Sequence, residues 1–194
     1  MVESFELRRV RDAADWDAAR TLRLGHADEF DRAHGTATYL LLAGERALGT
    51  TRSSAASPQG GSPLPCRRVF GAELASAFGD DATIVEASLT FVDPRAAPDP
   101  QEVLLRLFKV HMLRCAAEEA DALVVAVRDS QIGLYRRLFN MEILSGAEAY
   151  PDMASPRVLM GLAFREQAPV LLRRLPALAA SPEDAAEFAR GDLA

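Results

Sequence analysis

The stretch "IVEASLTFVDPRAAPDPQEVLLRLFKVHML", residues 84–113, reads as a buried strand, a loop broken by prolines and an amphipathic helix. The start of the helix is well marked. Asp99 can cap the first turn, Pro100 suits the first helical position, and Glu102 stands where a capping box needs an acid. Apolar side chains then recur at i, i+3 and i+4 spacing up to residue 115. Strand–loop–helix junctions of this kind commonly hold phosphate, because the first helical N–H groups point at the ligand.

This junction lacks the glycines that let a backbone approach a phosphate closely. None occurs between Glu86 and the end of the helix. Pro98 and Pro100 have no N–H to donate. Asp99 and Glu102 would satisfy the remaining amides and place negative charge where a diphosphate would sit. The sequence therefore disfavours a cradled diphosphate, and leaves room for a slender ligand beside the strand.

The remaining pattern predicts alternating strands and helices. Strands are expected at residues 5–10, 38–43, 48–52, 83–92 and 122–127, followed by an antiparallel pair in "MEILSGAEAY" and "VLMGLAF". Helices are expected after Asp12 and Asp99 and at residues 68–78 and 130–139, whereas residues 53–65, "SSAASPQGGSPLP", read as a flexible surface loop. This order predicts an α/β fold with a central mixed β-sheet and helices on both faces. We expect one domain of residues 1–168 and a C-terminal helical appendage of residues 169–194.

Composition narrows the classes of function. A net charge of −6 argues against a nucleic-acid binder. No apolar run approaches the roughly 18–20 residues that span a bilayer, and the first ten residues lack the layout of a secretory signal. Cys66 and Cys115 lie far apart and are expected to be reduced thiols of a cytoplasmic protein. The three histidines form no metal-ligand pattern, so no metal site is expected, and His111 is expected to be a packed core residue.

Several segments resemble known acyltransferases. "LYRRLFNMEIL" after a buried strand resembles the GNAT superfamily, in which a tyrosine-containing helix leads into a "GF-E" segment. "TYLLLAGERALGTTR", "LPCRRVFGAEL", "VEASLTFVDP" and "AYPDMASPRVLMGL" resemble two branches with GNAT folds, the acyl-homoserine-lactone (autoinducer) synthases and the long-chain N-acyl amino acid synthases. Glu86, Ser88 and Arg52 match the motifs of these families, whereas Leu89 stands where they have arginine. The resemblance, which spans residues 38–164, implies a GNAT-like sheet and acyl transfer from a thioester to an amine.

Such a transfer needs an amine freed of its proton, a polarised thioester carbonyl and a proton for the departing thiolate. Glu86 stands in an otherwise apolar strand, where burial would make its carboxylate a better base. The alternative is a structural ion pair with Arg52. Ser88 shares the face of Glu86 by strand alternation, and could contact the acyl carbonyl or the amine, or be an incidental strand serine. The resemblance gives Tyr135 the position of the phenol that protonates the leaving sulfur; the alternative is a core tyrosine.

Four further residues are expected to bind substrate. Arg52 is expected to hold Glu86 or a substrate carboxylate, or else to be a solvated arginine at a strand end. The backbone amides of Phe91 and Val92 are expected to polarise the carbonyl if the strand splays there, as GNAT strands do. Arg23 is the basic residue that the resemblance retains after the first helix, and is assigned to substrate binding.

The glycine-free junction favours a donor that carries its acyl group on a phosphopantetheine arm, as an acyl carrier protein does. This thioester (acyl carrier protein or acyl-CoA) would be a co-substrate, and no permanently bound cofactor is expected. Because carrier proteins are acidic, docking requires a local basic surface. Arg106 and Lys109 on one helix and Arg136 and Arg137 on another are the candidates, with solvated helix faces as the alternative.

The sequence therefore predicts an N-acyltransferase that moves a fatty acyl group from an acyl carrier protein, or acyl-CoA, to the amine of an amino-acid-like acceptor. One alternative is an acetyl-CoA-dependent GNAT N-acetyltransferase with a divergent pyrophosphate loop. Another is a non-catalytic protein of GNAT fold that binds an acyl ligand or a partner.

Overall fold

The computed structural model describes residues 5–26, 29–58, 60–61, 64–151 and 153–190 of the 194. In this part of the chain the strands are Phe5–Arg9 (β1), Thr36–Ala43 (β2), Arg46–Ser57 (β3), Gly60–Gly61 (β4), Ile84–Val92 (β5), Ala122–Val127 (β6), Glu142–Glu148 (β7) and Arg157–Ala163 (β8). The α-helices are Ala13–Leu22 (α1), Arg67–Phe78 (α2), Pro100–Ala117 (α3), Ile132–Phe139 (α4), Phe164–Arg174 (α5) and Pro182–Arg190 (α6). Short 3-10 turns occupy Glu29–Arg32 (η1), Asp129–Gln131 (η2) and Pro176–Leu178 (η3).

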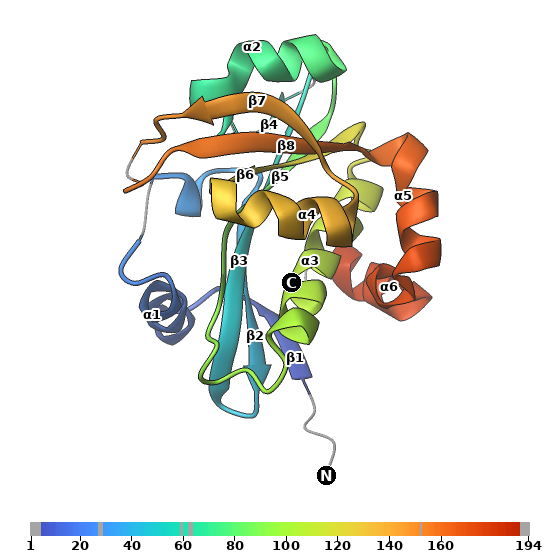
Figure 1. Cartoon of the computed structure of the whole chain (residues 1–194). Coiled ribbons are helices and arrows are strands. Elements are labelled where there is room, and N and C mark those ends of the chain that lie inside the picture. The colour runs from blue at the N-terminus through green and yellow to red at the C-terminus, as the bar shows by residue number, and fades with distance from the viewer. Residues whose placement is uncertain (1–4, 27–28, 59, 62–63, 152, 191–194) are drawn as a thin grey trace.

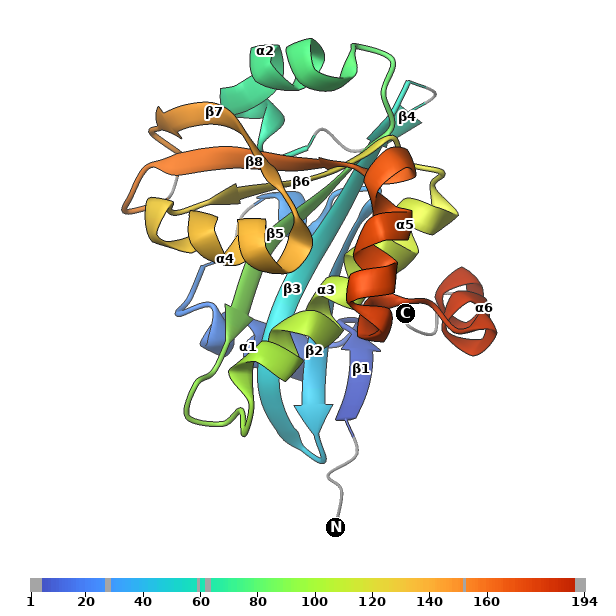
Figure 2. The same cartoon turned by 45° about the vertical axis from the view of Figure 1, so that its right-hand side comes forward.

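The strands form one mixed sheet in the order β1-β2-β3-β5-β6-β8-β7, with β4 paired to β3 (Figure 1). Within the described residues, β5 and β6 run parallel and the other neighbouring pairs run antiparallel. Helices α3, α4 and α5 lie in front of the sheet in Figure 2, and α1 lies behind it. The predicted α/β class, with a GNAT-like mixed sheet and helices on both faces, is confirmed.

Two hydrophobic layers hold the helices on the sheet. On the α3 face, Val85 and Ala87 of β5 pack with Phe108 and Met112 of α3. On the opposite face, Phe70 of α2 packs with Ile84, Val124 and Leu159 of the central strands. Burial of both faces explains why β5 and β6 read as near-continuous apolar runs.

Helix α3 begins with the Asp99 cap that its sequence predicts, whereas the Glu102 carboxylate pairs with Arg106 and is not seen to complete a capping box. The Asp99 carboxylate accepts hydrogen bonds from the Gln101 amide at 2.9 Å and the Glu102 amide at 3.2 Å. Glu102 in turn accepts from Arg106 one turn later, at 2.7 Å. The first amides of α3 are therefore already engaged by a carboxylate.

Strands β5 and β6 separate after four residue pairs. Their register runs from Ile84↔Ala122 to Ala87↔Val125, while β5 continues to Val92. On its other edge β5 carries a bulge: Ser88 pairs with Arg52 and Phe91 with Thr50 of β3, so two residues of β5 oppose Thr51. One of these two, Leu89, has φ 47°. The extra residue reverses the alternation, and Thr90 consequently lies beside Thr51 on the α3 face.

The prediction of a loop at residues 53–65 is wrong for residues 53–57. Strand β3 continues to Ser57, and Ser53 and Ser54 are fully buried. Their small side chains fit between β2 and β5, where Ser54 pairs with both Thr36 and Glu86. Within the predicted loop, residues 59, 62 and 63 lie outside the described residues.

The C-terminal helices share the core of the sheet. Leu171 of α5 and Leu178 of η3 belong to the same buried cluster as Phe108. Lys109 of α3 forms an ion pair with Asp184 of α6 at 2.7 Å. The division into residues 1–168 and 169–194 stays a prediction. None of the helices in the described ranges has the length and apolarity that crossing a membrane requires.

Candidate active site

Three adjoining cavities, together called the cleft, lie where β5 and β6 separate. An inner cavity of about 60 Å³ lies on the face opposite α3 and is lined by His26, Arg52, Glu86, Ser88, Leu89, Ala126, Tyr150, Pro151, Met153 and Arg157. A gap cavity of about 290 Å³ shares Ser88 and Leu89 with it and extends to Tyr135. An outer cavity of about 370 Å³ shares Thr90, Phe91 and Tyr135 with the gap cavity and reaches the start of α3 at Pro100 and Gln101. The cleft therefore opens on both faces of the sheet.

Glu86 brings a carboxylate to the inner cavity. The residue is buried, and its Oε2 accepts a hydrogen bond from the Cys66 amide at the start of α2, at 2.9 Å. Burial and the neighbouring Glu86 carboxylate raise the pKa of the Cys66 thiol well above its usual value, so this thiol stays protonated. The backbone of α2 thus fixes the carboxylate while the cavity leaves it within reach of a ligand.

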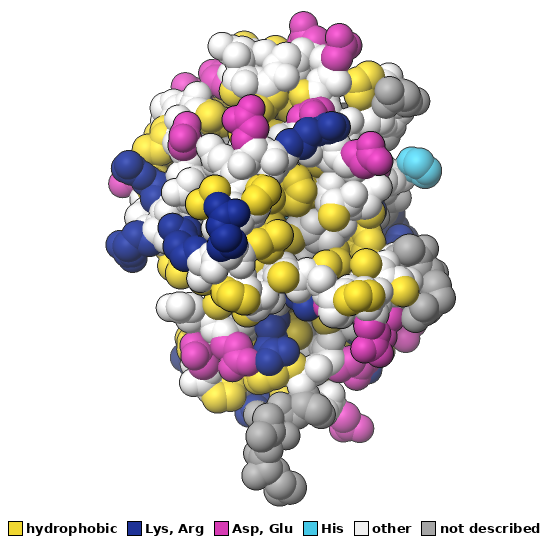
Figure 3. Space-filling view, turned by 90° about the vertical axis from the view of Figure 1, so that its right-hand side faces the viewer, with side chains coloured by type: hydrophobic (Ala, Val, Ile, Leu, Met, Phe, Trp, Pro, Cys, Tyr) yellow, Lys and Arg dark blue, Asp and Glu magenta, His cyan; other side chains and the backbone are white. Residues whose placement is uncertain are grey.

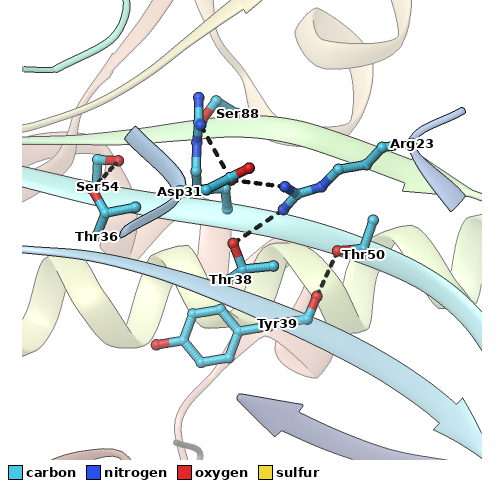
Figure 4. A network of polar contacts seen from close by, with 9 residues as sticks. Arg23, Asp31, Thr36, Thr38, Tyr39, Thr50, Ser54 and Ser88 are labelled. Carbon is cyan, nitrogen blue, oxygen red and sulfur yellow. Dashed lines mark hydrogen bonds and ion pairs between the residues drawn. The ribbon is translucent and has the colours of Figure 1, made fainter. Parts of the chain in front are cut away.

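Arg52 and Ser88 line the same cavity as Glu86 and belong to a polar network in which Figure 4 labels Ser88, Asp31 and Arg23. The Arg52 Nε donates to Ser88 Oγ at 3.0 Å, and its guanidinium lies 3.4 Å from Asp31 Oδ1. The expected position of Ser88 on the face of Glu86 is confirmed, since both line the inner cavity. Arg52 has partners on two elements, which fix the orientation of a cation beside Glu86.

Arg23 lies behind this network. It is fully buried, and its guanidinium donates to Asp31 Oδ1 at 2.8 Å and to Thr38 Oγ1 at 3.1 Å. The structure therefore places Arg23 where it orients Asp31, and through Asp31 the side chain of Arg52. The assignment of Arg23 to substrate binding stays a prediction.

Tyr135 stands on the other side of the sheet, in α4. Its ring belongs to an aromatic cluster, 6.4 Å from the Phe108 ring and 5.5 Å from the Phe139 ring between centroids. It lines both the gap cavity and the outer cavity. Burial raises the pKa of Tyr135 to about 12, so the phenol keeps its proton at neutral pH. Tyr135 can thus supply a proton inside the cleft.

The two β5 residues expected to offer amides line the outer cavity. The Asp93 amide donates to Leu48 O of β3 at 2.9 Å. Because amides alternate between the two edges of a strand, the Val92 amide points to the cleft edge and the Phe91 amide to β3. Of the two, Val92 is the one oriented to polarise a carbonyl in the cleft.

The four expected docking residues differ in their surroundings. Arg106 pairs with Glu102 and its guanidinium lies over the Phe5 ring, 4.4 Å from the centroid, and Lys109 pairs with Asp184. Arg136 and Arg137 are exposed in the last turn of α4.

Arg173 and Arg174, exposed in the last turn of α5, extend the basic surface of α4. The Arg174 side chain donates to Leu138 O of α4 at 2.7 Å, which brings the ends of the two helices together. Lys and Arg side chains gather on the left of the face in Figure 3. We call Arg136, Arg137, Arg173 and Arg174 the arginine cluster.

Some cleft residues could not be picked out from the sequence. Arg157 at the start of β8 lines the inner cavity, where its guanidinium donates to Ser155 Oγ at 2.6 Å. Burial, with the nearby charge of Arg128, lowers the pKa of Arg157. His26 and Thr90 also line the cleft. No local spacing links Arg157 or His26 to Glu86, because only the tertiary fold brings them together, and the bulge at Leu89 hides the face on which Thr90 lies.

Comparisons with known proteins give the family and the fold. The model of the family described as "N-acyl amino acid synthase FeeM" matches residues 18–163. The structure of FeeM, an N-acyl amino acid synthase from uncultured soil microbes, superposes with a TM-score of 0.70 at 22% identity, over 84% of this chain and 92% of FeeM. No curated protein sequence matches the chain.

Two acyl-homoserine lactone synthases share the fold. The CoA-dependent synthase MesI gives a TM-score of 0.53 at 22% identity, over 80% of this chain and 75% of MesI. The AHL synthase LasI gives 0.56 at 11% identity, over 81% of this chain and 88% of LasI. At these identities the likeness concerns the fold alone.

Proposed function

Because the chain belongs to the N-acyl amino acid synthase FeeM family and is an acyltransferase that acts on an amine, we propose that it moves a fatty acyl group from an acyl carrier protein to an amino-acid-like acceptor. The observation that supports this most directly is the two-sided cleft, which has Glu86 at one end and Tyr135 at the other. An acid–base pair separated by a gap in the sheet suits a reaction between two substrates that enter from opposite faces.

In this proposal the inner cavity takes the acceptor. Glu86 accepts the proton that the amine loses when it attacks the thioester. Arg52 and Arg157 line the same cavity and would pair with the carboxylate of an amino acid, since guanidinium groups bind carboxylates in a bidentate manner. Ser88, held by Arg52 Nε, would orient the amine or the acyl carbonyl.

The outer cavity takes the acyl-phosphopantetheine arm as co-substrate. The Val92 amide would polarise the thioester carbonyl, and Tyr135 would give its proton to the departing thiolate. The capped start of α3 supports a carrier as donor, because Asp99 already occupies the amides that would hold the diphosphate of CoA. The arginine cluster, together with Arg106 and Lys109, would dock the acidic carrier.

A transfer assay with three donors tests the proposal. Fatty acyl carrier protein, the matching acyl-CoA and acetyl-CoA are each incubated with a panel of amino acids, and amide products are measured by mass spectrometry. We expect amide with the acyl carrier protein, and a loss of about 10²-fold or more in kcat for Glu86→Gln. Glu45→Gln, in the exposed β2–β3 turn, is the matched control and should behave as the unmodified protein. Turnover with acetyl-CoA alone would overturn the carrier-dependent reading, and equal activity of Glu86→Gln would remove Glu86 as the base.

A further inference from the structure

Three hydrogen-bonded side chains connect the interior of α3 to the cleft. His111 Nε2 lies 2.9 Å from Thr51 Oγ1, which lies 2.7 Å from Thr90 Oγ1. His111 and Thr51 are fully buried, whereas Thr90 lines both the gap cavity and the outer cavity. The chemistry described above makes no use of these groups.

The surroundings of His111 decide which ring nitrogen carries hydrogen. Burial lowers the pKa of His111 to about 3, so the ring is neutral and has a single N–H. Among the described residues, nothing accepts from or donates to the buried Nδ1. A buried N–H without an acceptor is rarer in proteins than an unused acceptor. The hydrogen therefore belongs on Nε2, where it is donated to Thr51.

This tautomer fixes the direction of the hydrogen bonds that run from His111 through Thr51 to Thr90. Each hydroxyl has one hydrogen to donate. Thr51 accepts from His111, and so donates its own hydrogen to Thr90. Thr90 accepts from Thr51, which leaves its hydrogen free to be donated into the cleft.

We propose that the Thr90 hydroxyl donates a hydrogen bond to the thioester carbonyl oxygen, and that Thr51 and His111 hold it in that orientation. The inference rests on the proposed acyl transfer. As the amine nitrogen bonds to the carbonyl carbon, the electron pair of C=O moves to oxygen, where Thr90 and the Val92 amide bind it. When C=O forms again, the C–S bond breaks and the thiolate takes a proton from Tyr135. Thr90 is then a catalytic residue, and Thr51 and His111 are positioning residues.

The bulge of β5 is a second observation that supports this role. Leu89 at φ 47° is a strained conformation for a branched side chain. Without the extra residue, alternation would turn Thr90 to the face of Glu86, away from Thr51 and His111. The bulge thus delivers a hydroxyl to the side of the sheet where Tyr135 lies. The Phe108 ring packs against both His111 and Tyr135, with ring centroids 5.6 Å and 6.4 Å away.

Valine and serine variants test the catalytic part. Thr90→Val should lower kcat about 10²-fold, as loss of one oxyanion donor does elsewhere, with KM for the acyl carrier changed by less than about twofold. Thr51→Val should lower kcat about 10-fold, as for other residues that orient a reacting group. Thr90→Ser and Thr51→Ser keep the hydroxyl and should restore most of the activity.

The matched control is Thr50→Val. Thr50 is also fully buried in β3, but its hydroxyl donates to Tyr39 O at 2.9 Å and takes no part in the chain. It should keep kcat within about twofold of the unmodified protein. Unchanged kcat in Thr90→Val, or an equal loss in Thr50→Val, would overturn the proposal.

A measurement without substrate separates this inference from the proposed function. In protein labelled with ¹⁵N-histidine, the His111 ring should have a protonated Nε2 and an unprotonated Nδ1 at neutral pH. The opposite tautomer would overturn the proposed direction of these hydrogen bonds, even if the enzyme is active. Absence of any amide product from the unmodified protein, with the Nε2–H tautomer observed, would instead refute the proposed transfer and with it the role of Thr90.

Discussion

At the scale of single residues, the buried imidazole of His111 couples stability to pH. Its pKa falls to about 3 in the folded chain because burial disfavours the charged ring. In the unfolded chain the ring titrates near its ordinary value of 6.5. Between these two values the unfolded chain binds a proton that the folded chain does not.

We therefore expect the free energy of unfolding to fall as the pH drops below 6.5 and on towards 3. Going from about pH 7.5 to about pH 5, the loss from this residue is about 2 kcal/mol. His111→Gln has no group here that titrates. Between the same two pH values, its free energy of unfolding should fall by about 2 kcal/mol less than that of the unmodified protein. Urea unfolding at the two pH values measures the difference. Parallel losses in both proteins would contradict the low pKa of His111.

The catalytic candidates could be predicted from the sequence only where local pattern reveals them. Glu86 stands out because it interrupts an apolar strand, and Ser88 follows by alternation. Asp31 gives no such signal, yet it fixes both Arg23 and Arg52. Ion pairs between segments far apart in the chain depend on the tertiary fold, and no spacing rule encodes them.

At the scale of elements, the close approach of β3, β5 and α3 depends on one glycine. A Cβ at Gly49 would lie 2.8 Å from Phe91 O and 2.9 Å from Leu107 Cδ1. Both contacts are shorter than van der Waals packing allows, and the first involves backbone that cannot rotate away.

Gly49→Ala should therefore lower the free energy of unfolding by about 1–3 kcal/mol, the usual cost of overpacking. It should also lower transfer activity, because the displaced β5 segment lines the outer cavity. Gly71→Ala in α2 is the matched control, since the nearest atom to its added methyl is 3.8 Å away. It should stabilise the chain by about 0.5–1 kcal/mol, because alanine favours a helix over glycine. Thermal unfolding compares the two variants; a neutral Gly49→Ala would show that β5 shifts freely.

The same elements explain where prediction from sequence stops. The capped start of α3 could be predicted, because Asp99 and Pro100 act within one turn. The side of the sheet on which Thr90 lies could not be predicted, because strand alternation fails at the bulge. The left-handed residue of this bulge is a leucine rather than a glycine. The prediction of a loop at residues 53–57 is wrong because small polar side chains are typical of loops, whereas here they fit the narrow space between two strands.

At the scale of the whole molecule, the C-terminal helices contribute unequally to the core. Leu171 and Leu178 are buried with the α3 cluster, whereas α6 is attached by the Lys109–Asp184 pair and by Phe188.

A chain ending after residue 168 should lose roughly 4 kcal/mol or more, because each buried leucine contributes about 2–5 kcal/mol. A chain ending after residue 180 keeps both leucines but loses the Lys109–Asp184 pair and Phe188. It should lose markedly less, since a partly exposed ion pair contributes at most about 1 kcal/mol and Phe188 is only partly buried. Urea unfolding of both truncated chains measures this. Equal stability of the shorter chain would instead support residues 1–168 as an independent domain.

The arginine cluster predicts how a carrier protein would dock. Arg136→Glu with Arg137→Glu should raise KM for the acyl carrier about 10-fold or more, because reversed charges oppose an acidic partner. The KM for a free acyl-pantetheine thioester should stay the same, since neither residue lines the outer cavity. Arg20→Glu, on the exposed side of α1, is the control and should leave both constants unchanged. An equal rise of KM for both donors would argue against docking at this surface.

The separation of β5 and β6 after four residue pairs also bears on how a product leaves. Two substrates that approach from opposite faces of a sheet can each reach the gap without obstructing the other. In the proposed reaction, an amide bond would then join them into a single molecule that extends through the sheet, with its polar end beside Arg52 and its acyl part on the side of Tyr135. Such a product would leave by either entrance only if one of these two parts were drawn through the gap. Passage of the joined molecule between the two strands, rather than bond formation, would then set the turnover rate, and widening the gap would speed the enzyme.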